Sequence, residues 1–331
     1  MSKTQENKRR KPTKIKNIAA FPGVFLGVDG GGTKTQAILV DTDLQTLGEG
    51  RTGASNPLRV GVDRAVDNIR TAVDKACDAA EINRTDIVAA EIGLAGVRRE
   101  DMRELMRERL ISRLQVDLIE VVTDAEIALY GATDGKIGLV IIAGTGSVCR
   151  GKNAAGEIAT AGGWGPVAGD EGGGAGIAKR ALQAVAKASD GRGLPTRLSD
   201  FACDYFRAAT PDDLAMAIYS PTMTNDRIAG FTRYVIEAAR SGDSVALALL
   251  DEAGCELGLA ANAVIRKLDL ADETFQIAYV GGVFGAKELI FEPLLRKVHE
   301  IAPHAFLAPP LLSPTIAAAK MATKIAKAEN N

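Results

Sequence analysis

The residues with the clearest chemical potential lie in a glycine-rich segment, DGGGTKT, at positions 29–35. Three glycines between two strand-like runs leave backbone N–H groups uncovered, so several of them can point into one concavity that binds phosphate. Thr33 adds a hydroxyl donor, and Asp29 can hold the water shell of Mg²⁺. The spacing is not that of a Walker A loop, because Thr33 stands where that motif has lysine. Taken alone, such a segment would be interpreted as a plain glycine hairpin.

A second segment of the same kind, GTGS at positions 144–147, follows about 115 residues later. Two equivalent turns in duplicated halves could face each other across a cleft and hold successive phosphates of one nucleotide from two sides. A glycine pair at 281–282 follows a further strand-like run, and it could form a third turn against the adenosine. Three such loops at strand ends are not well explained by turn formation alone.

Asp124 is the carboxylate best placed to act as a base, because it follows a strand-like run at 118–122 and begins a helix. Capping that helix is one explanation for it. The functional explanation is compatible with capping, since a carboxylate beside a phosphate cleft can accept the proton of a hydroxyl that attacks a γ-phosphate. The chain has only two histidines, His299 and His304, both near its end. Catalysis by Ser-His-Asp or Cys-His is therefore nearly excluded, which favours a carboxylate base.

The densest glycine region, GGWGPVAGDEGGG at 162–174, contains the single tryptophan of the chain. Glycine at this density costs conformational entropy, so it indicates a closely approaching ligand or a demanding backbone path. Asp170 in this region can accept hydrogen bonds from sugar hydroxyls, or it can cap a helix. The triplet SNP at 55–57 is typical of a turn on composition alone.

The elements around these segments predict an α/β fold in two related halves with mixed sheets, because a strand–glycine turn–strand unit occurs twice with strands and helices alternating between the copies. Beyond residue 174 the chain is mainly helical. Strands are expected at 24–28, 35–40, 47–50, 87–94, 118–122, 139–142, 147–150 and 276–280, and helices at 61–81, 100–110, 125–130, 175–188, 211–219, 228–240, 245–268 and 314–327.

Composition and charge narrow the class of protein. The 331 residues are 46% apolar and 25% charged, which suffices for two domains. Residues 1–17 carry seven Lys or Arg and one Glu, whereas the whole chain has a net charge of −2. We therefore expect a disordered basic tail on an acidic body, and no nucleic-acid partner for that body.

Hydropathy and cysteine usage predict a cytoplasmic protein that has no membrane partner. The longest stretch without a charge, 301–319, contains four prolines and cannot form a spanning helix, and the polar start does not resemble a secretory signal. The four cysteines lie far apart without a C-x-x-C pair. That pattern fits a reduced protein without a zinc or iron–sulfur site built from one chain.

Together these segments resemble the sugar kinase and ATPase superfamily that includes actin, hexokinase and the 70-kDa chaperones. They are most similar to its N-acetylglucosamine kinase branch, which is grouped with the BadF/BadG/BcrA/BcrD-type ATPases. The resemblance rests on VDGGGTKTQAILVD, ASNP, IGLAG, TDAEIAL, IIAGTGSVCRG, GGWGPVAGDEGGGAGIA and YVGGVFGAKELI, which occur in the family's order across residues 24–327.

The resemblance implies two ribonuclease-H-like lobes, of the actin and hexokinase type, with the nucleotide in the cleft between them. An N-terminal lobe would span 23–135 and a C-terminal lobe 136–313. A last helix at 314–328 would pack back on the first lobe, and residues 1–22 would form the basic tail.

The resemblance also implies an ATP-dependent kinase for the 6-hydroxyl of an amino sugar, with N-acetylglucosamine preferred and glucosamine as the alternative. It would use Mg²⁺, organised by Asp29 through water, and a homodimer is plausible. Asp124 would be the catalytic base. ATP would be bound by Gly30, Gly31, Gly32, Thr33, Lys34, Gly144, Thr145, Gly146, Gly281 and Gly282. The sugar would be bound by Asn56, Asp124, Gly163, Trp164, Gly165 and Asp170.

Two other functions stay open. An ATPase that carries an iron–sulfur cluster needs thiolates close together, and none of the four cysteines shares a glycine-rich loop with a partner. A non-catalytic sugar sensor usually adds a helix-turn-helix module of roughly 60 residues. The 23 residues before the first expected strand are too few for such a module.

Overall fold

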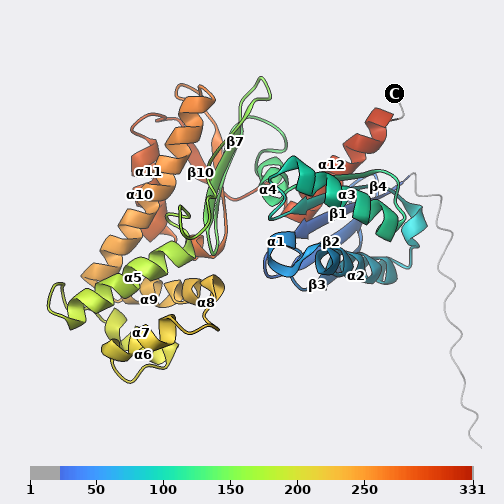
Figure 1. The fold of residues 1–331 in the computed structure, drawn as a ribbon. Coiled ribbons are helices and arrows are strands. Elements are labelled where there is room, and N and C mark those ends of the chain that lie inside the picture. Colours follow the sequence, from blue (N-terminus) through green and yellow to red (C-terminus); the bar gives the residue numbers. More distant parts are fainter. Residues whose placement is uncertain (1–22, 330–331) are drawn as a thin grey trace, which may run out of the picture.

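Two five-stranded mixed sheets form two lobes in the computed structural model, which describes residues 23–329 (Figure 1). The predicted tail at 1–22 lies outside the described residues. The strand orders are β3-β2-β1-β4-β5 and β10-β9-β6-β7-β8. In each sheet three strands run antiparallel and two more add in parallel, so β6 is the counterpart of β1 and β9 that of β4. The predicted duplication is confirmed at the level of topology.

The first sheet brings three strand ends to one edge. Strands β1, β4 and β5 are parallel, and Gly30 pairs with Leu94, which pairs in turn with Thr123. The glycine turn after β1 and the start of the helix after β5 therefore lie at the same edge. The strands of this sheet are β1 (Val24–Gly30), β2 (Thr35–Val40), β3 (Thr46–Thr52), β4 (Ile87–Leu94) and β5 (Ile119–Thr123).

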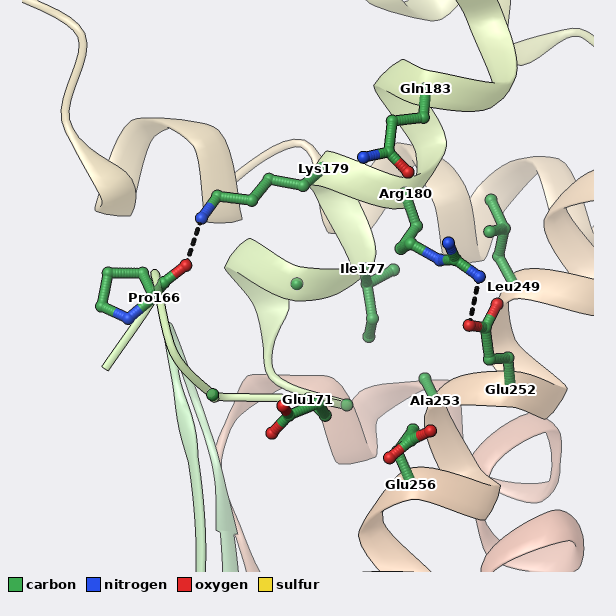
Figure 2. A pocket seen from close by; sticks show the side chains of 13 residues that line it. Pro166, Glu171, Ile177, Lys179, Arg180, Gln183, Leu249, Glu252, Ala253 and Glu256 are labelled. Carbon is green, nitrogen blue, oxygen red and sulfur yellow. Dashed lines mark hydrogen bonds and ion pairs between the residues drawn. The ribbon is translucent and has the colours of Figure 1, made fainter. Parts of the chain in front are cut away.

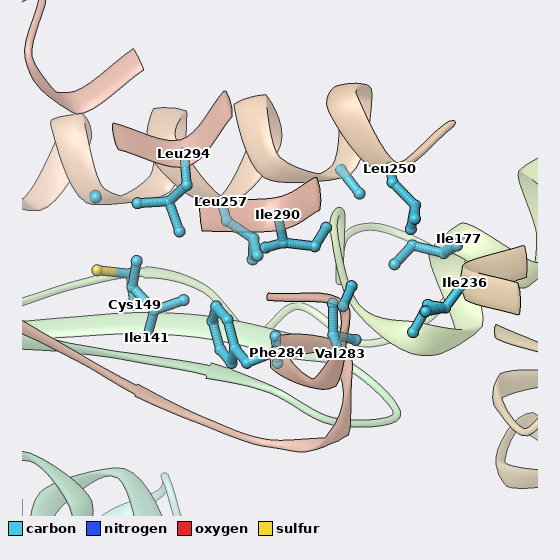
Figure 3. Packing of buried hydrophobic residues seen from close by; sticks show 14 of the residues in the cluster. Ile141, Cys149, Ile177, Ile236, Leu250, Leu257, Val283, Phe284, Ile290 and Leu294 are labelled. Atoms are coloured by element: carbon cyan, nitrogen blue, oxygen red, sulfur yellow. The ribbon is translucent and has the colours of Figure 1, made fainter. Parts of the chain in front are cut away.

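The second sheet packs its inner face on long helices. Ile141 and Cys149 of the sheet contribute to one buried cluster with Leu257 and Ile290 of the covering helices (Figure 3). The strands are β6 (Gly138–Ala143), β7 (Ser147–Lys152), β8 (Ile158–Gly162), β9 (Gln276–Val280) and β10 (Phe306–Ala308).

The helices follow the predicted ones in the first lobe and differ in the second. The expected helix 228–240 is two helices, because Gly230 lies against Tyr205, whose hydroxyl donates to the Arg227 carbonyl at the end of α8. The helices are α1 (Pro57–Val60), α2 (Val62–Ala80), α3 (Glu100–Leu114), α4 (Asp124–Thr133), α5 (Gly174–Ser189), α6 (Leu198–Phe206), α7 (Leu214–Ile218), α8 (Asn225–Ala229), α9 (Thr232–Arg240), α10 (Ser244–Lys267), α11 (Glu288–Val298) and α12 (Pro314–Glu329).

Helices α4 and α12 link the two lobes. Ala128 and Ala132 of α4 are buried with Val140 and Ala278 of the second sheet, although α4 follows a strand of the first. Helix α12 packs on the first sheet, and it comes so close to β1 that a Cβ at Gly27 would lie 2.2 Å from a carbonyl oxygen of α12. Within residues 23–329, every helix is too short or too polar to span a lipid bilayer.

Glu91 in β4 places an ionisable group inside the first lobe. Its side chain is 3% exposed. Burial, with smaller contributions from the charges of Glu120 and Glu126, raises the pKa of Glu91 to about 8. The carboxyl is therefore largely protonated at neutral pH in the folded protein, whereas it ionises near pH 4.5 in the unfolded chain.

Glu91 should make the protein less stable as pH rises. A raised folded-state pKa contributes stability that is complete below about pH 4.5 and is lost as pH rises through about 8. We expect Glu91→Gln to remove this contribution. Relative to the parent, the free energy of unfolding of the variant should rise by up to about 1.4 kcal/mol per pH unit between pH 5 and 8. Urea unfolding at several pH values measures this difference, with Glu108→Gln as the control, because Glu108 is exposed on α3. Parallel pH profiles of parent and Glu91→Gln would contradict the expectation.

Candidate functional site

A cleft of about 800 Å³ between the two lobes is lined by both glycine turns. This volume lies within the range of small-molecule sites. Of the predicted site residues, the cleft brings together Gly32, Thr33, Asn56, Asp124, Gly144, Thr145, Gly146, Gly163, Gly165 and Asp170.

The first turn is held in place by the segment that follows β3. The backbone N–H groups of Ser55 and Asn56 both donate to the Gly31 carbonyl, at 3.0 and 3.2 Å. A Cβ at Gly30 would lie 2.3 Å from the Ser55 Oγ, so only glycine permits this contact. Asn56 is the N-cap of α1, and its Oδ1 accepts a hydrogen bond from Leu58 at 3.0 Å. The SNP triplet thus begins a short helix, where composition alone indicated a turn.

The second turn is locked to the start of α5. The first backbone N–H groups of that helix, at Gly174 and Ala175, each donate at 2.8 Å to the carbonyls of Gly144 and Thr145. Since these carbonyls are engaged on the side of the helix, the turn is fixed without side chains that would fill the cleft. A Cβ at Gly146 would lie 2.3 Å from a carboxylate oxygen of Asp170.

The third glycine pair lies beside the second turn. Gly281 has a φ of +119°, and a Cβ there would lie 2.2 Å from the Ala143 carbonyl oxygen at the end of β6. Neither Gly281 nor Gly282 is among the residues that line the cleft. Lys34 is exposed next to the first turn, and its charge acts on Asp29.

Asp124 is the first residue of α4 and is not its cap. Thr123 is the N-cap, and its side chain and that of Glu126 form a capping box. The expectation that Asp124 caps the helix is therefore wrong, because the threonine before it does so. The Asp124 carboxylate instead accepts from the Ala125 N–H at 2.9 Å, and burial raises its pKa.

Asp29 and Asp124 form a pair of half-buried carboxylates at the common edge of β1 and β5. Burial and, to a smaller extent, the charge of Asp124 together raise the pKa of Asp29 to about 6, although the charge of Lys34 opposes them. Of the two, Asp124 lines the cleft and Asp29 does not. Two carboxylates in one corner of the first lobe resist simultaneous ionisation unless a cation or a proton lies between them. This corner can therefore accept either.

Most of the residues predicted to bind the sugar come from the loop between β8 and α5, whereas Asn56 and Asp124 belong to the first lobe. Asp170, at φ +63°, accepts backbone hydrogen bonds from Ser147 and Gly165, although burial raises its pKa overall. Gly163 and Gly165 both have positive φ, at 71° and 83°, so the glycine density serves a demanding backbone path. Trp164 is 69% exposed and lies outside the lining of the cleft. It stacks instead under the Arg98 guanidinium of the first lobe, 5.4 Å from the ring centre.

A second pocket, of about 360 Å³, lies behind this loop between α5 and α10 (Figure 2). Lys179 reaches over it and donates to the Pro166 carbonyl at 2.5 Å, while Arg180 pairs with Glu252 on α10. The loop is thus tied to α5 on its outer side and borders the cleft on its inner side.

Some cleft residues were not found from the sequence. Arg59 and Asp226 line the cleft from opposite lobes. Arg150 of β7, which is not among the lining residues, binds Glu126 at 2.9 Å, two residues after Asp124. In the sequence each looks like an ordinary surface charge. Only Arg59 could have been suspected of lying at the site, because it follows the predicted site residue Asn56 by three positions.

Comparison with known proteins decides the family. The model of the BadF/BadG/BcrA/BcrD ATPase family matches residues 26–308. The chain belongs to this family. An N-acetylmuramic acid/N-acetylglucosamine kinase of Clostridium acetobutylicum is 32% identical over 81% of this chain and 87% of its own length. An N-acetyl-D-glucosamine kinase of Dictyostelium discoideum is 32% identical over 90% of this chain and 97% of its own length.

The fold of this ATPase-family protein is also that of solved sugar kinases. A ROK family glucokinase from Streptomyces griseus, in complex with glucose and AMPPNP, superposes with a TM-score of 0.60 at 21% identity, covering 91% of this chain and 100% of that one. The predicted two-lobed actin and hexokinase type of fold is confirmed. The four cysteines lie on α2, β7, α6 and α10, and no metal-binding group of three or more His, Cys, Asp or Glu occurs in the described part of the chain.

A methyl group at Gly146 should disturb Asp170, which is predicted to bind the sugar. Gly146→Ala would push its Cβ into the Asp170 carboxylate, so we expect the KM for the sugar to rise about tenfold or more, the loss expected for one displaced charged hydrogen-bond partner. Gly285→Ala is the matched control, because nothing lies within 4 Å of a Cβ there. Steady-state kinetics on both variants test this, and an unchanged sugar KM in Gly146→Ala would contradict it.

Proposed function

We propose that this protein transfers the γ-phosphate of ATP to the 6-hydroxyl of N-acetylglucosamine, giving the 6-phosphate and ADP. One observation carries the proposal: two glycine turns of the kind that binds phosphate and the half-buried carboxylate of Asp124 line a single cleft. The coarser assignment, an ATP-dependent sugar kinase, follows from the ATPase family and from curated relatives that are named as sugar kinases.

In this proposal the two glycine turns bind the triphosphate from opposite lobes. The Gly31 and Gly144 N–H groups donate to the Lys34 and Gly146 carbonyls within the turns. The backbone N–H groups assigned to the phosphates are those of Gly32, Thr33, Thr145 and Gly146. Held by the turns, they neutralise phosphate charge without reorganising, which is the form of catalysis that phosphoryl transfer needs most. The adenosine lies toward Gly281 and Gly282, which adjoin the second turn.

The sugar lies in the same cleft, on the other side of the reacting γ-phosphate. Asn56 and Asp170 approach it from the two lobes, with the backbone of Gly163 and Gly165 between β8 and α5. Trp164 stands at the rim, where it contributes when the lobes close on the sugar. Closure excludes water, which would otherwise compete with the sugar hydroxyl for the phosphoryl group.

Asp124 acts as the general base. As the sugar 6-oxygen attacks the γ-phosphorus, the proton of the hydroxyl passes to the Asp124 carboxylate and the bond to the ADP oxygen breaks. A raised pKa makes this carboxylate a better proton acceptor than an exposed aspartate, and the Ala125 N–H keeps it oriented.

The carboxylate corner fits Mg²⁺ bound mainly through the nucleotide. Mg²⁺ commonly uses one or two carboxylates, waters and substrate phosphates, and Asp29 beside Asp124 offers that set. Burial and then the charge of Asp124 raise the pKa of Asp29, so a cation beside it would favour its ionised form. Asp29 would hold the ion through water, and the bound ion supplies charge neutralisation on the phosphates.

The proposal extends to the organisation of the chain. The lobes comprise residues 23–135 and 136–313, and the helix at 314–328 belongs to the first lobe, on which α12 packs. We place the reaction in the cytoplasm, where ATP is supplied, and a homodimer is compatible with it.

The direct test is ADP release with Mg·ATP and a panel of glucose, glucosamine, N-acetylglucosamine, N-acetylmannosamine and N-acetylmuramic acid. We expect N-acetylglucosamine to exceed glucosamine in kcat/KM by about tenfold or more, because a pocket shaped for the acetamido group leaves polar groups unpaired without it. NMR of the product locates the phosphate at position 6. Nucleotide binding without stimulation by any sugar would overturn the kinase proposal.

Asp124→Asn separates chemistry from binding. We expect kcat to fall by about 10²–10⁴-fold, which is the usual contribution of a positioned base, while nucleotide affinity stays within about twofold. Asp117→Asn is the control, because Asp117 is exposed just before β5. Near-parental turnover in Asp124→Asn would remove Asp124 from this role.

A further inference from the structure

Arg59 and Asp226 meet across the cleft, where the two glycine turns approach each other. Arg59 lies in α1 of the first lobe, and its Nη2 donates to the Asp226 Oδ2 of α8 at 2.5 Å. The second Asp226 oxygen, Oδ1, accepts from the Thr145 hydroxyl of the second turn at 2.8 Å. One carboxylate is thus held by donors from both lobes, and all three residues line the cleft.

The guanidinium of Arg59 also covers the first turn. Its Nη1 donates to the Gly32 carbonyl at 3.2 Å, and a Cβ at Gly32 would lie 2.6 Å from that nitrogen. The absence of a side chain at Gly32 therefore lets an arginine lie directly on the turn. An arginine that was only an exposed surface charge would not require such close contact with the backbone of Gly32.

The donors around Asp226 are those that a phosphate oxygen requires. A guanidinium presents a planar fork to two anionic oxygens, and a threonine hydroxyl beside a glycine turn adds a third donor. Although burial opposes it, hydrogen bonds from Arg59 and Thr145 hold the pKa of Asp226 below its usual range. Asp226 is therefore an anion at neutral pH, seated between two turns built for anions.

We propose that Arg59 is a ligand of the nucleotide phosphates and that Asp226 is its internal competitor. The triphosphate takes over the Arg59 guanidinium and the Thr145 hydroxyl, and Asp226 withdraws with α8. The exchange favours the nucleotide, because its phosphates carry more negative charge than one carboxylate, but part of the binding free energy is used to displace Asp226. The inference rests on nucleotide binding in the proposed function and not on the identity of the sugar.

Opposite effects of the two partners distinguish this role from a structural one. If the Arg59–Asp226 contact served only to connect the lobes, removal of either residue would break that connection. Both variants would then bind nucleotide less well. A ligand and its competitor respond in opposite directions. Loss of Arg59 removes a charged hydrogen-bond donor from the phosphates, whereas neutral Asp226→Asn competes less for the same donors.

The experiment is titration calorimetry of the full chain with Mg·AMPPNP, without sugar. We expect Arg59→Met to raise Kd by about 10- to 100-fold and Arg59→Lys to give an intermediate loss, since lysine keeps the charge without the fork. Asp226→Asn should lower Kd by about three- to tenfold. A Kd that rises in both Arg59→Met and Asp226→Asn, or one that does not change in Arg59→Met, would overturn the proposal.

A matched ion pair in the first lobe supplies the controls. Arg113 of α3 binds Asp67 of α2 at 2.8 Å, away from the cleft. Arg113→Met and Asp67→Asn should leave Kd within about twofold, and thermal unfolding verifies that every variant is folded. Because no sugar is present, failure of the sugar panel leaves this result intact, and the two proposals can fail separately.

Discussion

The packing of α4 against both sheets at once is the constraint on which the site depends. Ile127 packs so closely on the first sheet that a Cβ at Gly93 would lie 2.4 Å from it, while Leu129 is buried against the second sheet. The capping box at the start of the helix is bound from the second lobe by Arg150. Asp124, the first residue of α4, is therefore positioned by the core of each lobe and not by a flexible loop.

Glycine in this chain mostly marks places where two elements touch. Gly27 admits α12 to the face of β1, Gly30 admits the Ser55 side chain, and Gly146 admits the Asp170 carboxylate. The turns are consequently narrow and firmly held by the elements that they touch. Electrostatic preorganisation needs rigidity, because donors that must reorient contribute less in the transition state.

The sequence predicts what is local and strongly patterned. Strands at 35–40, 87–94 and 276–280 match β2, β4 and β9, and both glycine turns come together in one cleft as predicted. It does not reveal β10, which has three residues, or α11, which contains Pro293. Arg59 and Asp226 are 167 positions apart. Their contact depends on the arrangement of the lobes, which no local pattern encodes.

The position of α12 has a consequence for how the protein is made. Helix α12, which begins at Pro314, covers the face of the first sheet that carries Phe25, Ile38 and Ala89. The ribosome synthesises this helix long after the three sheet residues. At about 5–20 residues per second, a ribosome leaves this apolar face without its native cover for tens of seconds. The first lobe, although it emerges first, cannot complete its core before α12 has been synthesised, so the nascent chain exposes an apolar sheet face that chaperones are suited to shield.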